Sequence, residues 1–402
     1  MSFQPPIGTD DITALRSQAW RETLALWEQW SARYGYPLVS TPVFETTELF
    51  ERGVGETTEV VTKQMYTFTD QGDRSMTLRP EGTAGVMRAY LNSGHQGVWK
   101  GAYSGPFFRY ERPQAGRRRQ FWQVGVELLD TASPLADVEV IELGYRFINA
   151  TGLAEVALLV NSIGDQTCRP AYVDILRDYL RARETDLSPD AVRLIDRNPL
   201  RVLDSKADQP SLTGAPRMVD HLCADCSAHH NEVKGGLDGL EIRYQDEPNL
   251  VRGLDYYTRT AFEYVATGLG TAQNAVGGGG RYDGLAEALG GRPTPGVGFA
   301  LGIDRMMLAL GDPERAYLDA YLVSETGPEE GLRVASQLRA QGLRVDLDTD
   351  GRSVKAQFRA ARRLNVPVVV VWRGDGRLVD VQTRDEHIEM PLQEVSSWFS
   401  KG

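Results

Sequence analysis

Cysteine is scarce in this chain, with three residues among 402. Three cysteines cannot form a disulfide framework, so a reducing compartment is expected, most simply the cytoplasm. Long apolar runs are missing too, and none approaches the roughly 20 residues that a membrane-spanning helix needs. The segment from Met1 to Thr9 lacks a basic stretch followed by an apolar one, so we expect no secretory signal. These absences predict a cytoplasmic protein with no membrane partner.

The short motifs of several enzyme classes are also missing. The sequence has no Gly-x-x-x-x-Gly-Lys-Ser/Thr phosphate loop and no full Gly-x-Gly-x-x-Gly fingerprint. The missing fingerprint disfavours dinucleotide redox chemistry. The sequence also has no Gly-x-Ser-x-Gly nucleophile elbow, which disfavours covalent hydrolysis. The net charge of −11 argues against a protein that coats nucleic acid without specificity. From Arg315 to the C-terminus, however, acidic and basic residues are equal in number, so this end repels a polyanion least.

Apolar periodicity and turn residues predict a sheet domain at the N-terminal end of the chain. Prolines within one strand pattern place that strand at an edge or an interface. The expected elements are a helix from Asp10 to about Arg33, the proline-broken strand 36–44, an antiparallel meander over 56–76, a helix over 82–91, and strands over 107–112 and 121–129.

The pattern becomes helical between about Thr167 and Asp238, and strand patterns then return, which predicts a helical insertion within the sheet domain. After Asp312-Pro313, strands and helices alternate, as in a separate α/β unit. The expected elements are helices over 171–183 and 189–195, strands over 240–244, 259–265 and 275–279, and then strand 320–323, helix 329–341, strand 344–347, helix 353–364 and strand 368–372.

Three arginines lie in aromatic or glycine-rich segments that look like strands, namely Arg109, Arg252 and Arg305. A guanidinium keeps its charge and binds phosphate or carboxylate through two parallel hydrogen bonds. Three that converge would hold a triphosphate without a phosphate loop. A lone arginine more often pairs with a surface acid, but three in such settings favour an anion site.

These segments resemble known motifs. Arg109 with its flanks, the loop after it and the segment FWQVGVE (121–127) resemble motif 2 of class II aminoacyl-tRNA synthetases, and GFALGIDR (298–305) resembles motif 3. Pro42 matches the motif 1 proline. The segments LVRGLDYY (250–257), GGRYDGL (279–285), TLRPEGT (77–83) and PIGTD (6–10) are similar to histidyl-tRNA synthetases in particular. The resemblance runs nearly end to end, with Asp304 where the family often has Glu.

The resemblance implies an α+β fold, in which a class II antiparallel sheet domain with a helical insertion precedes a C-terminal α/β anticodon-binding domain. The implied division is 1–164 and 241–314 for the two parts of the catalytic domain, 165–240 for the insertion and 315–402 for the anticodon-binding domain. Motif 1 implies a symmetric homodimer. The implied reaction is the activation of L-histidine with ATP and its transfer to tRNA(His).

By the same resemblance, Arg252 and Arg109 are the catalytic residues. Arg109 would hold the α-phosphate of ATP and Arg305 the γ-phosphate, while Arg252 would bridge the α-phosphate and the histidine carboxylate. Glu111 and Arg117 would also bind ATP, and Mg²⁺ would arrive on its phosphates without a cage of protein ligands.

Histidine would be held at both of its ends. Arg109 and Arg252 would contact its carboxylate end, and Glu127 and Tyr257 would satisfy the two ring nitrogens. Side-chain alternation in a strand leaves open that Tyr256 or Tyr257 packs in the core instead. The other residues implied in histidine binding are Glu81, Thr83 and Gln123 at the ammonium end, and Tyr256 and Tyr282 in the pocket wall.

Several further patterns allow two interpretations. The run Gly277 to Gly280 indicates a close approach of backbone to ligand, or a flexible loop. The loop with Arg117, Arg118 and Arg119 is either a contact for the acceptor stem, with Gln114 reading a base, or a solvated turn. Five basic residues near one helix suit a phosphate contact with the anticodon stem, or a solvated face. They are Arg352, Lys355, Arg359, Arg362 and Arg363.

The segment from His221 to His230 invites a zinc interpretation, since it contains Cys223, Cys226 and His229. A structural zinc usually needs a second ligand pair, and Cys168 stands apart in the sequence, so an ordinary helical segment is favoured. The main rival function is a non-catalytic, histidine-sensing paralogue that regulates ATP phosphoribosyltransferase. The three arginines and the C-terminal unit argue against that rival. Another class II synthetase and a generic RNA-binding protein are less favoured still.

Overall fold

The computed structural model describes residues 3–55, 58–153, 155–205, 207–266, 274–311, 317–374, 378–383 and 385–400. The chain forms two compact units, the first comprising Met1–Asp11 and Trp20–Gly311 and the second Ile12–Ala19 and Asp312–Gly402. Within the described ranges, no helix has both the length and the apolar character needed to cross a membrane.

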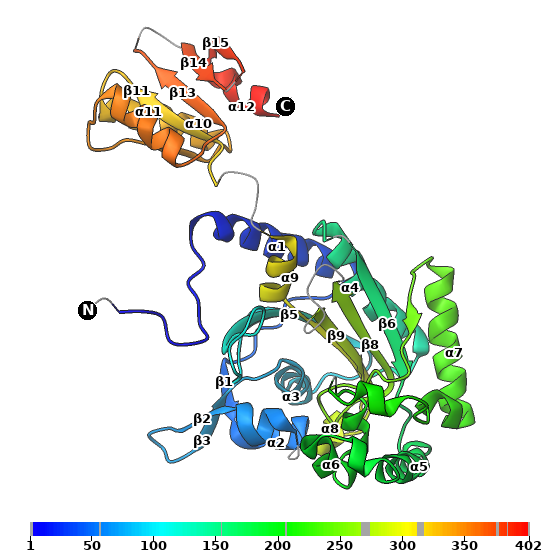
Figure 1. Ribbon diagram of the computed structural model, residues 1–402. Coiled ribbons are helices and arrows are strands. Elements are labelled where there is room, and N and C mark those ends of the chain that lie inside the picture. Colours follow the sequence, from blue (N-terminus) through cyan, green and yellow to red (C-terminus); the bar gives the residue numbers. More distant parts are fainter. Residues whose placement is uncertain are drawn as a thin grey trace. The chain divides into compact units, whose positions relative to one another are not determined.

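A seven-stranded sheet forms the centre of the first unit (Figure 1). All neighbouring strands are antiparallel except the last pair, which is parallel. This sheet confirms the predicted α+β class. In spatial order the strands are β4 (Trp99–Phe108), β5 (Gln120–Leu129), β10 (Gly296–Gly302), β9 (Ala275–Arg281), β8 (Thr258–Ala266), β6 (Val156–Ser162) and β7 (Gln245–Asp246).

Two helices, α1 (Ala14–Arg33) and α4 (Pro134–Ala150), cover one face of this sheet. Trp27 of α1 packs edge-on against Phe147 of α4 and Phe299 of β10, with ring centroids 5.1 and 6.0 Å apart. Ser133 caps α4 by accepting a hydrogen bond from the Leu135 amide, and a proline occupies the first turn. These helices leave the opposite face of the sheet available for a site.

A small sheet and four short helices complete this part of the first unit. The strands are ordered β1 (Phe44–Thr46), β3 (Ser75–Leu78), β2 (Tyr66–Thr69), and the helices are α2 (Thr47–Val54), α3 (Thr83–Ser93), α8 (Leu285–Ala288) and α9 (Ile303–Leu310). The meander prediction is wrong for its first part, because Val60–Gln64 forms a π-helical turn; Glu56 lies outside the described residues. Of the proline-broken strand, only the bridge between Leu38 and Ala102 and the pairing of Phe44 at the start of β1 are found, since proline has no amide donor.

Between Arg169 and Gly239 the described chain is helical, as predicted. The helices are α5 (Arg169–Arg181), η2 (Glu184–Asp186), α6 (Pro189–Ile195), η3 (Pro199–Val202), η4 (Gln209–Leu212), η5 (Met218–His221) and α7 (Ala224–Gly239). The strand expected over 240–244 is wrong, because pairing begins only at Gln245. The strand expected over 107–112 is also misplaced, since β4 ends at Phe108. The division of the first unit into catalytic and insertion domains stays a prediction.

The second unit has a five-stranded sheet in the order β12-β11-β13-β14-β15. Its first three strands are parallel, which confirms the βαβ prediction, and β14 and β15 add an antiparallel hairpin that was not predicted. The Asp312-Pro313 boundary and Arg315 lie outside the described residues. The elements are β11 (Ala320–Ser324), α10 (Pro328–Ala340), β12 (Val345–Leu347), α11 (Val354–Arg363), β13 (Val368–Trp372), β14 (Leu378–Gln382), β15 (His387–Pro391), η6 (Leu392–Glu394) and α12 (Val395–Phe399).

Candidate active site

One row of residues across the central sheet forms the floor of a cavity. Tyr103 pairs with Gly125, Gly125 with Ala300, Ala300 with Gly278 and Gly278 with Glu263, from β4 to β8. Residues directly opposite each other in antiparallel strands point to the same face. Their sequence neighbours point to the other face, as Phe299 of β10 does where it packs against Trp27 of α1. The cavity therefore lies opposite α1 and α4, with small residues in the middle and Tyr103 and Glu263 at the sides.

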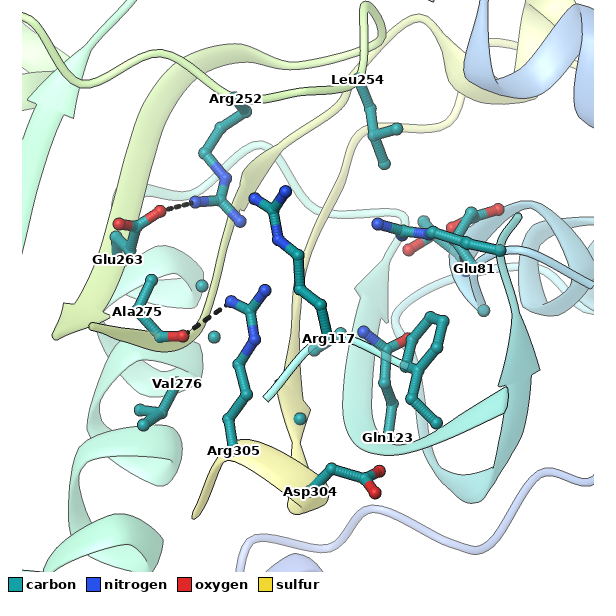
Figure 2. Close-up of a pocket in the computed structure, with 18 of the residues that line it drawn as sticks. Glu81, Arg117, Gln123, Arg252, Leu254, Glu263, Ala275, Val276, Asp304 and Arg305 are labelled. Carbon is teal, nitrogen blue, oxygen red and sulfur yellow. Dashed lines mark hydrogen bonds and ion pairs between the residues drawn. The ribbon is translucent and has the colours of Figure 1, made fainter. Parts of the chain in front are cut away.

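The three arginines singled out by the sequence all line this cavity, together with Arg117. In Figure 2 the guanidinium groups of Arg117, Arg252 and Arg305 extend into the same space. Arg109 comes directly after β4 and is held by a hydrogen bond from its Nε to the Pro80 carbonyl, 2.8 Å away. The structure thus brings together side chains from three distant parts of the chain.

Arg252 and Arg305 are held by different partners. Arg252 Nη1 donates to Glu263 Oε2 at 2.6 Å. Arg305 donates to the carbonyls of Ala275 and Gly116, at 2.8 and 3.1 Å (Figure 2). Neither residue lies in a strand: Arg252 is in the irregular segment before β8, and Arg305 is in α9. The strand context expected for these two residues is wrong, because backbone contacts and one carboxylate fix them instead.

The positive charges in the cavity outnumber the acids that neutralise them. Burial lowers the pKa of Arg305, and the nearby Arg117 and Arg109 lower it further. Burial also opposes the charge of Arg252, but the carboxylate of Glu263 and the hydroxyls of Tyr257 and Tyr256 together outweigh it and raise the pKa of Arg252. Glu111 pairs loosely with Arg117 at 3.5 Å and with Arg109 at 4.0 Å. Such a cavity favours a ligand with several negative charges.

Polar and aromatic groups line the rest of the cavity, away from Arg305. They include Glu81, Thr83, Gln123, Tyr256 and Tyr257. The two tyrosine rings lie against each other with centroids 4.6 Å apart. Both tyrosines precede β8, so strand alternation does not apply to them and neither is excluded from the cavity.

Glu127 and Tyr282 lie one layer behind the cavity wall. Thr83 Oγ1 donates to Glu127 Oε1 at 2.8 Å, and the Tyr282 hydroxyl donates to the other oxygen of the same carboxylate. Burial raises the pKa of Glu127 to about 8, although the hydrogen bonds from Tyr282 and Thr83 counteract it. Burial also raises the pKa of Glu81, whose oxygens accept from the amides of Thr83 and Ala84 at 2.7 and 2.9 Å.

Gln123 offers an unused acceptor. Its Oε1 is buried, and within the described part of the chain it has no hydrogen-bond partner. A buried unsatisfied oxygen is costly unless a ligand supplies the donor. The ammonium group of an amino acid is such a donor.

Comparison with known proteins decides the family. The family model for histidyl-tRNA synthetase matches residues 8–306, and the model for an anticodon binding domain matches residues 321–402. The chain belongs to the histidyl-tRNA synthetase family. A histidine–tRNA ligase from Thermosynechococcus vestitus is 45% identical to it over 419 aligned residues, which cover 100% of this chain and 97% of the relative.

Solved structures agree with this family. An apo histidyl-tRNA synthetase from S. aureus is 33% identical and has a TM-score of 0.76, with 99% of this chain and 100% of that chain covered. A Bacillus halodurans structure titled as an ATP phosphoribosyltransferase regulatory subunit/histidyl-tRNA synthetase is 23% identical, with a TM-score of 0.68 and coverage of 94% and 100%. At that identity the likeness shows the fold alone.

The glycine run typical of histidyl-tRNA synthetases makes room for protein groups as well as for a ligand. A Cβ at Gly278 would lie 3.0 Å from Arg252 Nη1, and outside the run a Cβ at Gly298 of β10 would lie 1.8 Å from Glu127 Oε2. Gly277 and Gly278 line the cavity. All four glycines of the run belong to β9, so the flexible-loop interpretation is wrong.

Arg281 of the second histidyl-tRNA synthetase motif does not reach the cavity. It is fully buried and forms a bidentate ion pair with Asp137 of α4, which also contacts His229 Nε2 at 3.3 Å. Its remaining hydrogens go to the carbonyls of Thr131 and Ser133 and to the Asp283 carboxylate, whose Oδ1 lies 3.1 Å from Nη1. This part of the motif therefore fastens β9 to α4 and α7.

Among the cavity residues that escaped the sequence reasoning are Tyr103 and Glu263. Glu263 lies in a predicted strand, but its importance rests on its pairing opposite Gly278 and its contact with Arg252. The alternation of Gly101, Tyr103 and Gly105 along β4 is a usable clue, because small residues on both sides leave room for one large ring.

The expectation that Cys168 stands alone is also wrong. Its sulfur lies in a cluster with Asp165, Cys223 and Cys226. His229 belongs to the Asp137 ion pair instead. The segment from His221 to His230 thus contributes Cys223 and Cys226 to the cluster and His229 to the ion pair.

Proposed function

We propose that this cavity forms histidyl-adenylate from ATP and L-histidine and then transfers histidine to tRNA(His). As a member of the histidyl-tRNA synthetase family, the chain is an aminoacyl-tRNA synthetase. The single observation that supports the chemistry best is that Arg109, Arg252 and Arg305 share one cavity with Thr83 and Gln123. Two anionic reactants meet there beside fixed positive charge, so catalysis consists mainly of positioning and charge neutralisation.

Each arginine has a proposed role. Arg109 holds the α-phosphate, and Arg305 holds the γ-phosphate from the other side of the cavity. Arg252 bridges the α-phosphate and the histidine carboxylate, and the Glu263 pair fixes its orientation. Glu111 and Arg117 also bind ATP. The histidine carboxylate attacks the α-phosphorus, and pyrophosphate leaves.

Histidine lies toward Gln123 and the tyrosines. Its ammonium group donates to Glu81, Thr83 and the unused Gln123 Oε1. Arg109 and Arg252 hold its carboxylate end. Glu127 and Tyr257 satisfy the ring nitrogens, which requires the Thr83–Glu127 hydrogen bond to rearrange when histidine binds. A site that bonds both nitrogens rejects amino acids without them. Tyr256 completes the wall, and Tyr282 acts from behind it through its hydrogen bond to Glu127.

Mg²⁺ fits the carboxylates that face the phosphate end. Glu111 and Glu263 line the cavity beside the arginines and would supply oxygen ligands, together with the ATP phosphates. When bound, Mg²⁺ neutralises part of the phosphate charge. Loss of exchange after Mg²⁺ removal, restored by adding it back, tests this.

Histidine-dependent ATP–pyrophosphate exchange tests the function. We expect exchange with L-histidine and none with a panel of other amino acids. Exchange with a different amino acid would point to another class II synthetase. Absence of exchange would favour the regulatory alternative, which the full-length similarity to histidine–tRNA ligases already disfavours.

The tRNA contacts are proposed on charge. Lys355, Arg359, Arg362 and Arg363 of α11 are all exposed, and we propose that they contact phosphates of the anticodon stem. Arg117, Arg118 and Arg119 are proposed to face the acceptor stem, although Arg118 also pairs with Asp10 and Asp304. Titration of tRNA binding against salt tests both, since each lost phosphate contact lowers the slope by about one.

We further propose a cytoplasmic homodimer. Phe44 and Phe68 of the small sheet are 52% and 42% exposed beside the chain around Pro42 (the motif 1 segment), with ring centroids 6.2 Å apart. Val43 is also exposed. Exposed apolar side chains that cluster mark an interaction surface. The oligomeric state in solution tests this proposal.

A further inference from the structure

Four side chains of metal-binding type meet outside the cavity. One ligand atom each of Asp165, Cys168, Cys223 and Cys226 lies within 4.8 Å of all the others. Asp165 Oδ1 is 3.5 Å from Cys168 Sγ and 4.0 Å from Cys223 Sγ. Sulfur ligands about 2.3 Å from a tetrahedral zinc stand about 3.8 Å apart. The ligand atoms therefore already lie near the separations that zinc imposes.

The sequence spacing of the cluster supports the same metal. Asp165 and Cys168 form one pair with two residues between them, and Cys223 and Cys226 form another. Two such pairs, distant in the chain and joined by the fold, are the arrangement of structural zinc sites. Three sulfurs and one carboxylate suit zinc better than Mg²⁺ or Ca²⁺, which prefer oxygen alone. We propose that these four residues bind one structural zinc ion.

The local backbone prepares the ligands. Cys168 precedes the first residue of α5 and Cys223 precedes the first residue of α7, so the amide ends of two helices lie beside the sulfurs. Helix N-termini favour thiolates. Arg259 Nη2 lies 3.4 Å from Asp165 Oδ2, which leaves Oδ1 directed at the sulfurs, as an outer partner orients a metal ligand. Gly164 has φ +64°, and a Cβ there would lie 2.9 Å from Cys168 Sγ.

The zinc would join the start of α5 to the start of α7 and support the histidine pocket. Arg169 follows Cys168, and its Nη2 donates to the carbonyls of Tyr257 and Gly164 at 2.8 and 2.9 Å. Tyr257 lines the cavity. A metal that fixes the start of α5 thus also fixes the backbone that carries Tyr257. This step rests on the proposed histidine site, but the binding of zinc does not.

Metal analysis of the full-length chain, purified under reducing conditions, tests the proposal. We expect one zinc per chain, a lowered Tm after chelation and recovery when zinc is added back. The double variant Cys223→Ser/Cys226→Ser should lose the zinc. Asp225→Asn is the matched control, because this exposed acid lies between the two cysteines without belonging to the cluster, and it should keep the zinc.

Cobalt replacement in the unaltered chain guards against a variant that fails to fold. We expect thiolate-to-cobalt charge transfer in the near ultraviolet and the visible bands of tetrahedral cobalt. Folded chain that binds neither zinc nor cobalt would overturn the proposal. So would a disulfide between two of the three cysteines in freshly purified protein, or unchanged zinc content in the folded double variant. Full zinc content in a chain without pyrophosphate exchange would contradict the proposed function and leave the metal site standing.

Discussion

Arg252 combines a fixed charge with a fixed position, because it is half-buried in the cavity and paired with Glu263. Lysine keeps the charge but loses the planar pair of donors that bridges two anions. We expect Arg252→Lys to lower kcat/KM for histidine-dependent exchange by about 10²-fold or more, as removal of one oxyanion donor does, with tRNA affinity unchanged. Arg193→Lys, on the exposed face of α6, is the control. Activity of Arg252→Lys within a few-fold of the parent chain would remove this residue from the proposed mechanism.

Glu127 gives the stability of the ligand-free protein a pH dependence. Burial raises its pKa from the ordinary 4.5 to about 8 in the folded chain. Between these values the folded state holds a proton that the unfolded state has released, so stability falls as pH rises. The contribution is complete below about 4.5 and is lost as pH rises through about 8. Glu127→Gln cannot titrate, so we expect its Tm to fall less across this window.

Thermal unfolding at several pH values measures that difference, with the exposed Glu232→Gln as control. Some slope should remain, because burial also raises the pKa of Glu81. Equal slopes for Glu127→Gln and the parent chain would contradict the protonation proposed for the empty site. The same variant should raise KM for histidine more than KM for ATP, because a neutral amide oxygen accepts from an imidazole N–H more weakly than a carboxylate does.

Between elements, the buried ion pair of Arg281 and Asp137 joins β9 to α4, and both side chains are fully buried. Removing one partner leaves an uncompensated charge in the core, which costs about 3–5 kcal/mol. We expect Arg281→Met to lower the free energy of unfolding by about that amount. The double variant Arg281→Met/Asp137→Leu should be less destabilised than the single one. Denaturant unfolding measures both.

The exposed pair of Arg193 and Asp190 supplies the comparison, since such pairs contribute about 0–1 kcal/mol. A double variant no more stable than Arg281→Met would show that packing, and not the charge left behind, dominates at this junction. In that case Arg281 of the segment GGRYDGL (279–285) would stabilise this junction through its packing and not through its charge.

Elements with a strong local pattern were predictable from the sequence. Helix α6 and strand β13 match their predicted bounds, because Ser188 and Pro189 mark a helix start and Val368–Trp372 is a run of β-formers. Leu240 to Tyr244 has strand propensity but follows α7 directly. This segment forms the turn that leads from the end of α7 back to the sheet. Pairing with β6 then begins only at Gln245, where a partner strand is within reach.

The site was predictable where a motif carried it and unpredictable where it depended on tertiary pairing. The three arginines and most of the residues proposed to bind the substrate histidine lie in short segments that resemble known motifs. Glu263, by contrast, matters because strand register sets it beside Arg252. Cys168 and Cys223 are 55 positions apart in the chain, and only the fold brings their sulfurs together. Periodicity contains no information about such contacts.

At the scale of the whole molecule, the exposed rings of Phe44 and Phe68 beside the motif 1 segment predict self-association. A glutamate at such a surface would place a charge in an apolar interface, which costs far more than it does in water. We expect Phe44→Glu to shift the chain from dimer to monomer in sedimentation or light scattering. Ile175→Glu changes another apolar residue, 41% exposed on α5, and it should stay dimeric. A parent chain that is monomeric at micromolar concentration would refute the homodimer. Dimers of both variants would place the interface elsewhere.

Since β1 of the small sheet pairs with β3, which ends at Leu78 and leads directly to Glu81 and Thr83, a broken interface should also weaken histidine activation.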